Sequence, residues 1–174
     1  GDLACIVAED LVLYQSFDRQ KVSSWLRQEK LTTVLELDWG FSILQVTPAL
    51  KCDFLVGWTR EVAVSSQMVQ QIKKNIDSNF LTASKNTVVR LVEALAQGDK
   101  EKVIERMEQA SQLLEGLSSD IYTPSLRQLK AASKGLTAVA KSSGAGGGDC
   151  GIALSFDEVS TESLKSRWAD LGIE

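Results

Sequence analysis

The order of apolar patterns along the 174-residue chain predicts an α+β fold with two layers, in which helices pack on a mainly antiparallel sheet. Two observations support this prediction. Strand-like runs occur twice before a long helical region and twice around a glycine-rich turn, at residues 39–46, 52–59, 136–140 and 151–156. Apolar residues at steps of three and four predict four intervening helices, at residues 66–76, 85–96, 100–117 and 125–136.

The N-terminal region has helical character. The apolar run from Leu3 to Leu13 is interrupted only by Glu9 and Asp10, which predicts a helix or a strand that is buried on every side. If residues 3–14 are helical, at least in their first half, Asp2 is the expected N-cap. Two further helical segments are expected at residues 21–28 and 31–37. Because a natural chain rarely starts inside a core, we expect residues to have preceded Gly1.

The two strands that follow should form an antiparallel pair through a turn at Pro48. Asp99 is expected to cap the third of the four helices, and Pro124 to occupy the first turn of the fourth. A last helix is predicted from Thr161 to Leu171, where Gly172 would end it. Ile173 could begin another strand.

Composition limits the class of protein. Apolar residues make up 44% of the chain and charged residues 24%, values that are typical of soluble globular domains. The net charge of −4 argues against a general nucleic-acid binder, and no apolar run approaches the length of a membrane span. We therefore expect a cytoplasmic protein with neither nucleic acid nor a membrane as a partner.

Histidine is absent from the sequence, which excludes the Ser-His-Asp and Cys-His schemes of nucleophilic catalysis. Cys5, Cys52 and Cys150 are far apart, so we expect reduced thiols rather than a disulfide framework or a CxxC metal site. Any chemistry must then use carboxylates, cationic side chains, hydroxyls and backbone amides. Phosphoryl transfer meets this restriction, because it depends mainly on positioning and charge neutralisation.

The most informative stretch is the glycine run from Lys141 to Gly151, whose sequence is Lys-Ser-Ser-Gly-Ala-Gly-Gly-Gly-Asp-Cys-Gly. Glycines accept positive φ and allow close approach, so several N–H groups of such a run can point at one phosphate. The dinucleotide fingerprint fails at Asp149, and no Gly-Lys-Ser/Thr closes the run as a Walker A loop requires. A flexible linker is the alternative, although apolar strands on both sides argue against it.

This run resembles the C-terminal glycine-rich motif of the small-molecule kinases that include galactokinase, homoserine kinase, mevalonate kinase and phosphomevalonate kinase. Within that superfamily, Asp149-Cys150, Gly1-Asp2-Leu3-Ala4 and the stretch from Gly57-Trp58-Thr59 to Ser65-Ser66 resemble the bacterial phosphomevalonate kinases. The resemblance implies a ferredoxin-like C-terminal kinase domain at residues 39–174. It also implies that residues 1–38 are the end of an N-terminal kinase domain and a connector, and that the ATP-binding N-terminal half is not in this sequence.

The resemblance further implies roles for individual residues. Asp2 would be the catalytic carboxylate, and Arg60 lies near the expected substrate loop. Substrate would be bound by Ser65, Ser66, Lys141 and Ser143, and the phosphate loop would comprise Gly144, Ala145, Gly146, Gly147 and Gly148. The implied cofactors are ATP and Mg²⁺, with metal ligands that the sequence does not identify.

The implied reaction moves the ATP γ-phosphoryl group to the 5-phosphate of phosphomevalonate, giving 5-diphosphomevalonate. Since a phosphate with a second pKa of about 6 is already ionised at neutral pH, Asp2 would orient groups rather than act as an obligatory base. Three alternatives stay open: a mevalonate kinase, a diphosphomevalonate decarboxylase, or a non-catalytic domain of the same fold. We expect this chain alone to have little kinase activity.

Overall fold

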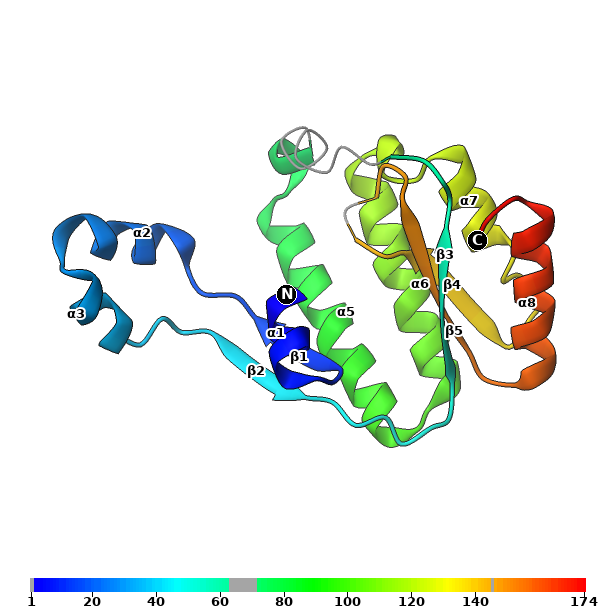
Figure 1. Cartoon of the computed structure of the whole chain (residues 1–174), viewed down its shortest axis with the longest axis horizontal. Coiled ribbons are helices and arrows are strands. Elements are labelled where there is room, and N and C mark those ends of the chain that lie inside the picture. Colours follow the sequence, from blue (N-terminus) through cyan, green and yellow to red (C-terminus); the bar gives the residue numbers. More distant parts are fainter. Residues whose placement is uncertain (1, 63–71, 145) are drawn as a thin grey trace. The chain divides into compact units, whose positions relative to one another are not determined.

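The computed structural model describes residues 2–62, 72–144 and 146–174. The chain forms two compact units, Gly1–Thr47 and Pro48–Glu174, and each is described by itself (Figure 1). This division groups residues 39–47 with the first unit, because a strand within them pairs with an earlier strand of that unit. The assignment of residues 1–38 to an N-terminal kinase domain stays a prediction.

The first unit is a small helix-and-ribbon structure. Strands β1 (Val12–Gln15) and β2 (Ser42–Gln45) are antiparallel, with Val12 opposite Gln45. The aromatic rings of Phe17 and Trp39 meet edge to face just beyond the ribbon, with their centroids 5.2 Å apart. The elements in chain order are α1 (Asp2–Ala8), β1 (Val12–Gln15), α2 (Arg19–Gln28), α3 (Leu31–Glu36) and β2 (Ser42–Gln45).

Two predictions for this region meet different outcomes. The helix expected over residues 3–14 is confirmed in its first half and ends at Ala8, because Glu9 takes a φ of 52° and the following Val-Leu-Tyr run is extended. The expected burial on every side is wrong, since Leu3, Ile6 and Val7 are exposed. The predicted pairing of residues 39–46 with 52–59 is wrong. A pattern of alternating residues identifies a strand but not its partner, and both strands pair with distant segments.

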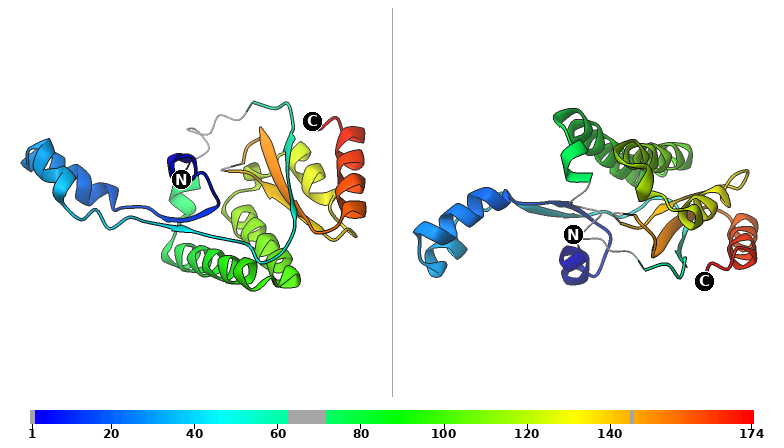
Figure 2. Two further views of the ribbon diagram at one scale, coloured as in Figure 1. Left: turned by 60° about the horizontal axis from the view of Figure 1, so that its bottom comes forward. Right: turned by 90° about the horizontal axis from the view of Figure 1, so that it is seen from above.

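The second unit contains a three-stranded antiparallel sheet of order β3-β5-β4, with helices packed against it (Figure 2). This arrangement confirms the predicted α+β class. The strands are β3 (Asp53–Trp58), β4 (Ala138–Ser142) and β5 (Cys150–Ser155). The helices are α5 (Ser78–Gln97), α6 (Lys100–Leu117), α7 (Pro124–Ala131) and α8 (Glu158–Asp170), with short 3₁₀ turns η1 (Lys73–Asn75) and η2 (Ser119–Ile121).

The core of this unit lies between one face of the sheet and helices α7 and α8. Leu129, Leu164 and Trp168 pack on small strand residues, among them Ala140 and Ala153. The Trp168 indole N–H also donates to the Leu129 carbonyl oxygen at 3.0 Å, so the largest buried side chain of α8 has its polar atom satisfied. Alanines on the strands let the two helices approach the sheet closely.

The opposite face of the outer strand β3 is open. Because side chains alternate along a strand, Phe54, Val56 and Trp58 point away from the core, and they are 62%, 55% and 45% exposed. The free edge of β3 pairs with the end of the chain, since the N–H groups of Trp58 and Glu174 each donate to the other's carbonyl oxygen. Regular strand structure does not begin at Ile173, where the sequence suggested another strand, and Glu174 alone pairs with this edge.

Helix ends follow their capping residues. Helix α6 has the predicted bounds, and the Asp99 carboxylate caps it by accepting from the Lys102 N–H at 3.1 Å. Pro124 is the first residue of α7, as predicted. Helix α8 starts at Glu158 instead of Thr161, because Asp157 caps it by accepting from the Ser160 N–H at 2.7 Å.

The other boundaries also shift. Helix α5 begins at Ser78, capped by Asp77, well before the predicted start at residue 85. Helix α7 ends at Ala131, and the turns after it occupy the rest of the predicted segment. The helix expected at residues 66–76 lies mostly outside the described residues, and its last part contains η1.

The Asp157 cap predicts an acid-sensitive contribution to stability. The Ser160 N–H bond lowers the pKa of the Asp157 carboxyl, so the folded state binds this proton less readily than the unfolded state. The contribution is therefore present above the unfolded pKa of about 4 and is lost as the pH falls through the lower, folded pKa.

Urea unfolding of wild type and Asp157→Asn at pH 7 and pH 2.5 measures this contribution. Asparagine still caps but does not titrate, so the stability difference between the two proteins should shrink at pH 2.5. An equal difference at both pH values would contradict the assignment.

Candidate phosphate-binding loop

The glycine run forms the tip of a tight hairpin between β4 and β5. Ser142 lies opposite Gly151 in the antiparallel register, and the Ser143 N–H donates to the Cys150 carbonyl oxygen at 3.0 Å. Strand β4 continues two residues beyond its predicted end, so Lys141 belongs to the strand. The prediction of an ordered turn between two strands is confirmed, and the alternative of a flexible linker is wrong.

The backbone at the tip requires glycine at particular positions. Gly146, Gly147 and Gly148 have φ angles of 78°, 83° and 120°, which residues with a Cβ rarely adopt. A Cβ on Gly146 would also collide with the carbonyl oxygen of Ile121. Gly144 differs from these three, because a Cβ there would meet open space.

Besides the Ser143 N–H, two amides of the loop are already used within the protein. The Gly147 N–H donates to the Ile121 carbonyl oxygen at 2.9 Å, and the Asp149 N–H donates to the Glu61 carbonyl oxygen at 2.8 Å. Among the residues that the structure describes, the N–H groups of Gly144, Gly146 and Gly148 donate to no acceptor. These three amides are the donors that the protein itself leaves unused, with Gly144 exposed and Gly146 and Gly148 buried.

Lys141 places a poorly hydrated cation in the strand that leads into the loop. Burial lowers the pKa of its ammonium group, and its Nζ donates to the carbonyl oxygen of Ser142. No carboxylate lies within salt-bridge distance of it in the described part of the chain. An anion arriving near Nζ would stabilise the charged form that burial disfavours.

A buried polar cluster lies where β4 enters the loop. The Tyr122 and Ser111 hydroxyls are 2.5 Å apart, and the Ser142 N–H donates to the Tyr122 oxygen at 3.3 Å. The Ser142 hydroxyl is fully buried and has no partner in the described structure. Tyr122 could not be predicted from the sequence, because no local motif relates it to a loop that lies about twenty residues later.

The other predicted site residues are only partly placed. Asp2 is the first residue of α1, and its side chain is not described. Ser65, Ser66 and Ala145 lie outside the described residues, whereas Ser143 is exposed beside the loop. Arg60 pairs with Glu174 and has a φ of 61°.

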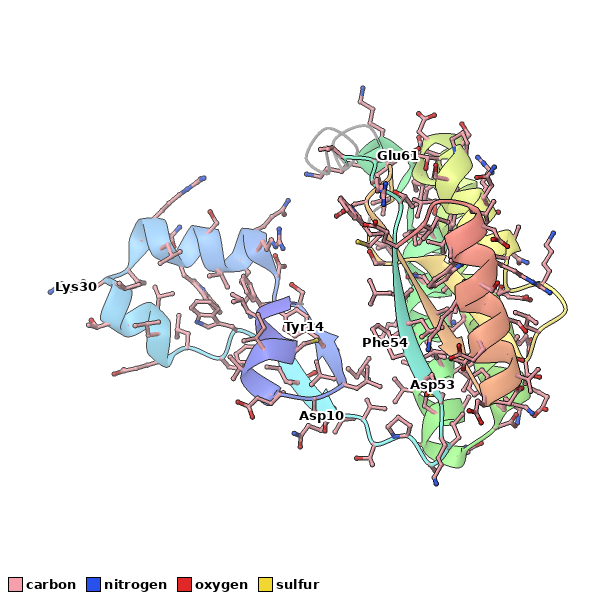
Figure 3. All side chains as sticks on the ribbon, turned by 45° about the vertical axis from the view of Figure 1, so that its right-hand side comes forward. Asp10, Tyr14, Lys30, Asp53, Phe54 and Glu61 are labelled. Atoms are coloured by element: carbon pink, nitrogen blue, oxygen red, sulfur yellow. The ribbon has the colours of Figure 1, made fainter. Side chains whose placement is uncertain are left out.

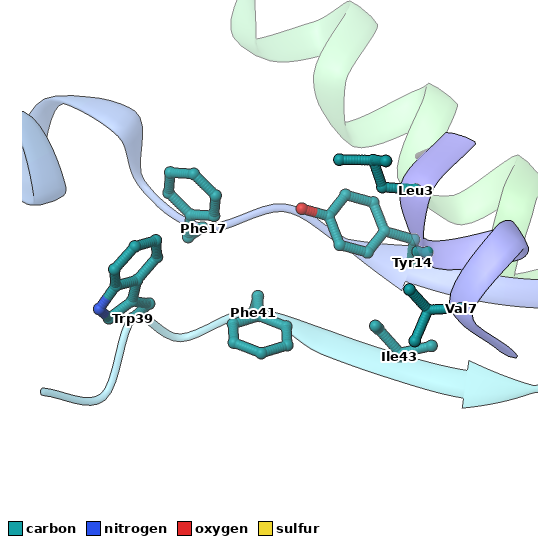
Figure 4. Close-up of a pocket in the computed structure, with 8 residues that line it drawn as sticks. Leu3, Val7, Tyr14, Phe17, Trp39, Phe41 and Ile43 are labelled. Atoms are coloured by element: carbon teal, nitrogen blue, oxygen red, sulfur yellow. The ribbon is translucent and has the colours of Figure 1, made fainter. Parts of the chain in front are cut away.

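Two cavities that lie away from the glycine loop are poorly suited to phosphate. A groove of about 490 Å³ in the first unit has no charged lining residue, being lined by Leu3, Ala4, Val7, Tyr14, Phe17, Trp39, Phe41 and Ile43 (Figure 4). A larger hollow lies at the Asp53 end of β3, which Figure 3 shows at the opposite end of the strand from Glu61. Its four carboxylates (Asp53, Asp157, Glu158 and Glu162) outnumber its two lysines (Lys51 and Lys165) and would repel phosphate.

Residues 91–174 match the family of C-terminal domains of GHMP kinases. The chain contains a GHMP kinase C-terminal domain. This finding confirms the superfamily resemblance drawn from the glycine run, which lies inside the matched residues as the β4–β5 hairpin of the GHMP kinase domain.

Phosphomevalonate kinases are among the proteins similar to the whole chain. A complex of the Streptococcus pneumoniae enzyme with phosphomevalonate and AMPPNP is 78% identical, with a TM-score of 0.98, over 100% of this chain and 53% of that chain. The enzyme of Streptomyces sp. (strain CL190) is 31% identical over 99% of this chain and 50% of its own length. The chain thus spans about half the length of these relatives.

A more distant likeness shows the fold alone. The mevalonate kinase of L. major in complex with R-mevalonate is 17% identical, with a TM-score of 0.66, over 75% of this chain and 41% of that chain.

In the part of the chain that the structure describes, no helix combines the length and apolar character needed to cross a bilayer.

The different environments of two loop glycines predict unequal effects of substitution. Gly146→Ala should lower the free energy of unfolding by about 2 kcal/mol or more, because alanine is strained at positive φ and its Cβ meets a backbone oxygen. Gly144→Ala is the matched control and should stay within about 0.5 kcal/mol of wild type. Urea unfolding measures both, and equal losses would refute the described loop geometry.

Proposed function

We propose that this chain forms the C-terminal half of a phosphomevalonate kinase, which transfers the ATP γ-phosphoryl group to the 5-phosphate of phosphomevalonate. The observation that carries the proposal is the combination of three free loop amides with the desolvated Lys141. The 78% identity to an enzyme with phosphomevalonate and AMPPNP in its complex supports the choice of substrates. The product would be 5-diphosphomevalonate.

The proposed chemistry uses charge neutralisation more than proton transfer. Both substrates carry phosphates, so repulsion between them is the main barrier to bringing the acceptor oxygen to the γ-phosphorus. The N–H groups of Gly144, Gly146 and Gly148 and the ammonium group of Lys141 would offset that repulsion. The acceptor phosphate is already ionised near neutral pH, which is why Asp2 would orient the reacting groups without having to remove a proton.

The hydroxyls of Ser65, Ser66 and Ser143 complete the proposed substrate contacts as neutral hydrogen-bond donors. Mg²⁺ would come with ATP. The described residues contain no group of three or more His, Cys, Asp or Glu that could hold a metal ion, so no protein ligand is assigned to it. Magnesium often keeps several waters and is bound largely through substrate phosphates, which fits such a site.

The remaining half of the relatives' polypeptide is the proposed partner of the first unit. Three apolar residues of α1, Leu3, Ile6 and Val7, are 77%, 68% and 78% exposed, and Leu3 and Val7 line the apolar groove of that unit. Apolar side chains gathered on one helix face are typical of a surface that packs against protein. That half would also supply the rest of the ATP site.

Replacement of Lys141 tests its phosphate role. Lys141→Met should raise the dissociation constant for Mg-ATP or tripolyphosphate at least about tenfold, since a charge-assisted hydrogen bond is lost. Lys165→Met removes the same charge from an exposed site on α8 and should change affinity less than about twofold. Equal effects of the two variants, measured by isothermal titration, would contradict the proposed role of Lys141.

The pH dependence of binding gives a second test. Because burial lowers the Lys141 pKa, the affinity of the wild-type chain should decline at alkaline pH before ordinary lysines titrate.

Turnover tests the substrate assignment. The 174-residue chain should release little ADP with phosphomevalonate, and a chimera with the half of the Streptococcus pneumoniae relative that this chain does not cover should release it steadily. Mass spectrometry should then show a retained diphosphate. Turnover on mevalonate instead, or loss of CO₂ from the product, would move the activity to another member of the superfamily.

A further inference from the structure

Glu61 connects three parts of the second unit that are far apart in sequence. It lies three residues beyond the end of β3 and is half-buried at the hairpin end of the sheet (Figure 3). Its backbone carbonyl oxygen accepts from the Asp149 N–H of the glycine loop at 2.8 Å. Its side-chain Oε1 accepts from the Ser125 hydroxyl at 2.7 Å, in the first turn of α7.

A bulge in the strand pairing places Glu61 there. The Thr59 N–H and hydroxyl both donate to the Asp149 carbonyl oxygen, at 2.8 and 2.7 Å, while the Asp149 N–H returns to Glu61. Thr59, Arg60 and Glu61 thus all lie opposite Asp149, two residues more than regular pairing would place there, and the φ of 61° at Arg60 lies in the left-handed region. Such bulges change the direction of a strand and re-aim the side chain that follows, here Glu61.

The glycine loop also depends on Glu61 for space. A Cβ on Gly148 would lie 3.1 Å from the Glu61 Cβ, so a side chain at this position would crowd Glu61. Movement of Glu61 would therefore shift Gly148, whose N–H is one of the three free amides of the loop. The Gly147 amide is held separately, through Ile121.

We propose that Glu61 is a positioning residue for the phosphate loop, and that its carboxylate acts by anchoring to Ser125 rather than by contacting substrate. The inference rests on the proposed function for its effect on ATP. The carboxylate would repel a phosphate, so its presence beside a phosphate loop is explained by the anchor and not by ligand binding. The anchor fixes Glu61, which in turn fixes Gly148 and Asp149.

Three variants separate the anchor from the charge. Glu61→Ala and Ser125→Ala each break the side-chain bond from one side, whereas Glu61→Gln keeps an oxygen that can accept from Ser125 and removes only the charge. Hydrogen exchange of the ligand-free chain, followed by NMR, reads the Asp149 amide directly. The Gly147 amide is an internal control, because its acceptor is Ile121.

We expect exchange at Asp149 to accelerate about fivefold or more in Glu61→Ala and in Ser125→Ala, which corresponds to the loss of one hydrogen bond. The double variant should be no faster than either single variant, because both remove the same bond. Glu61→Gln should exchange within about twofold of wild type, and Gly147 should be unchanged in every variant. The dissociation constant for Mg-ATP should follow the same order.

Two results would overturn the proposal. One is wild-type exchange at Asp149 in Glu61→Ala, and the other is a Glu61→Gln variant as impaired as Glu61→Ala, which would assign the effect to charge. A general loss of folding would instead accelerate Gly147 together with Asp149 and would also count against a positioning role. If the chimera gives no turnover on phosphomevalonate, the proposed function fails, while the exchange data still decide what Glu61 does.

Discussion

The hydrogen bond from the Gly147 N–H to the Ile121 carbonyl oxygen is the constraint on which the glycine hairpin depends. It draws the tip of the hairpin onto the turn between α6 and α7, so closely that Gly146 has no room for a Cβ. The positive φ angles of the next residues follow from that contact, because the chain must reverse within a few residues to enter β5. Which amides remain free is thus decided by this bond and by the one from Asp149.

Lys141 contributes a second constraint, which is electrostatic. Burial of an ammonium group without a carboxylate partner disfavours its charged form and lowers its pKa. A hydrophobic residue in the same position would lower the stability of the fold less, so stability alone gives no reason for a lysine there. An anion bound at the loop would give a reason for the lysine. It would pair with the ammonium charge and raise the Lys141 pKa back toward its usual value.

The sequence predicted elements better than it predicted their partners. Helix α6 and the glycine turn were located because helical periodicity and glycine clustering are local signals. The pairing of β3 with β5 was missed, because about ninety residues separate Trp58 from Cys150 and alternation does not encode a partner. Glu61 and Tyr122 were missed for a related reason, as each acts on the loop through a contact made only in the fold.

The absence of histidine agrees with the kind of reaction proposed. An acceptor that is already a phosphate needs no strong base near neutral pH, so catalysis can rest on groups that hold and neutralise anions. Backbone amides serve this purpose only if their directions are fixed before the anion arrives, because reorientation would cost part of the stabilisation. In this chain the fixing is done from outside the loop, by Ile121 at its centre and by Glu61 at its end. The sites that hold the loop are therefore as much a part of its proposed chemistry as the glycines that would touch phosphate.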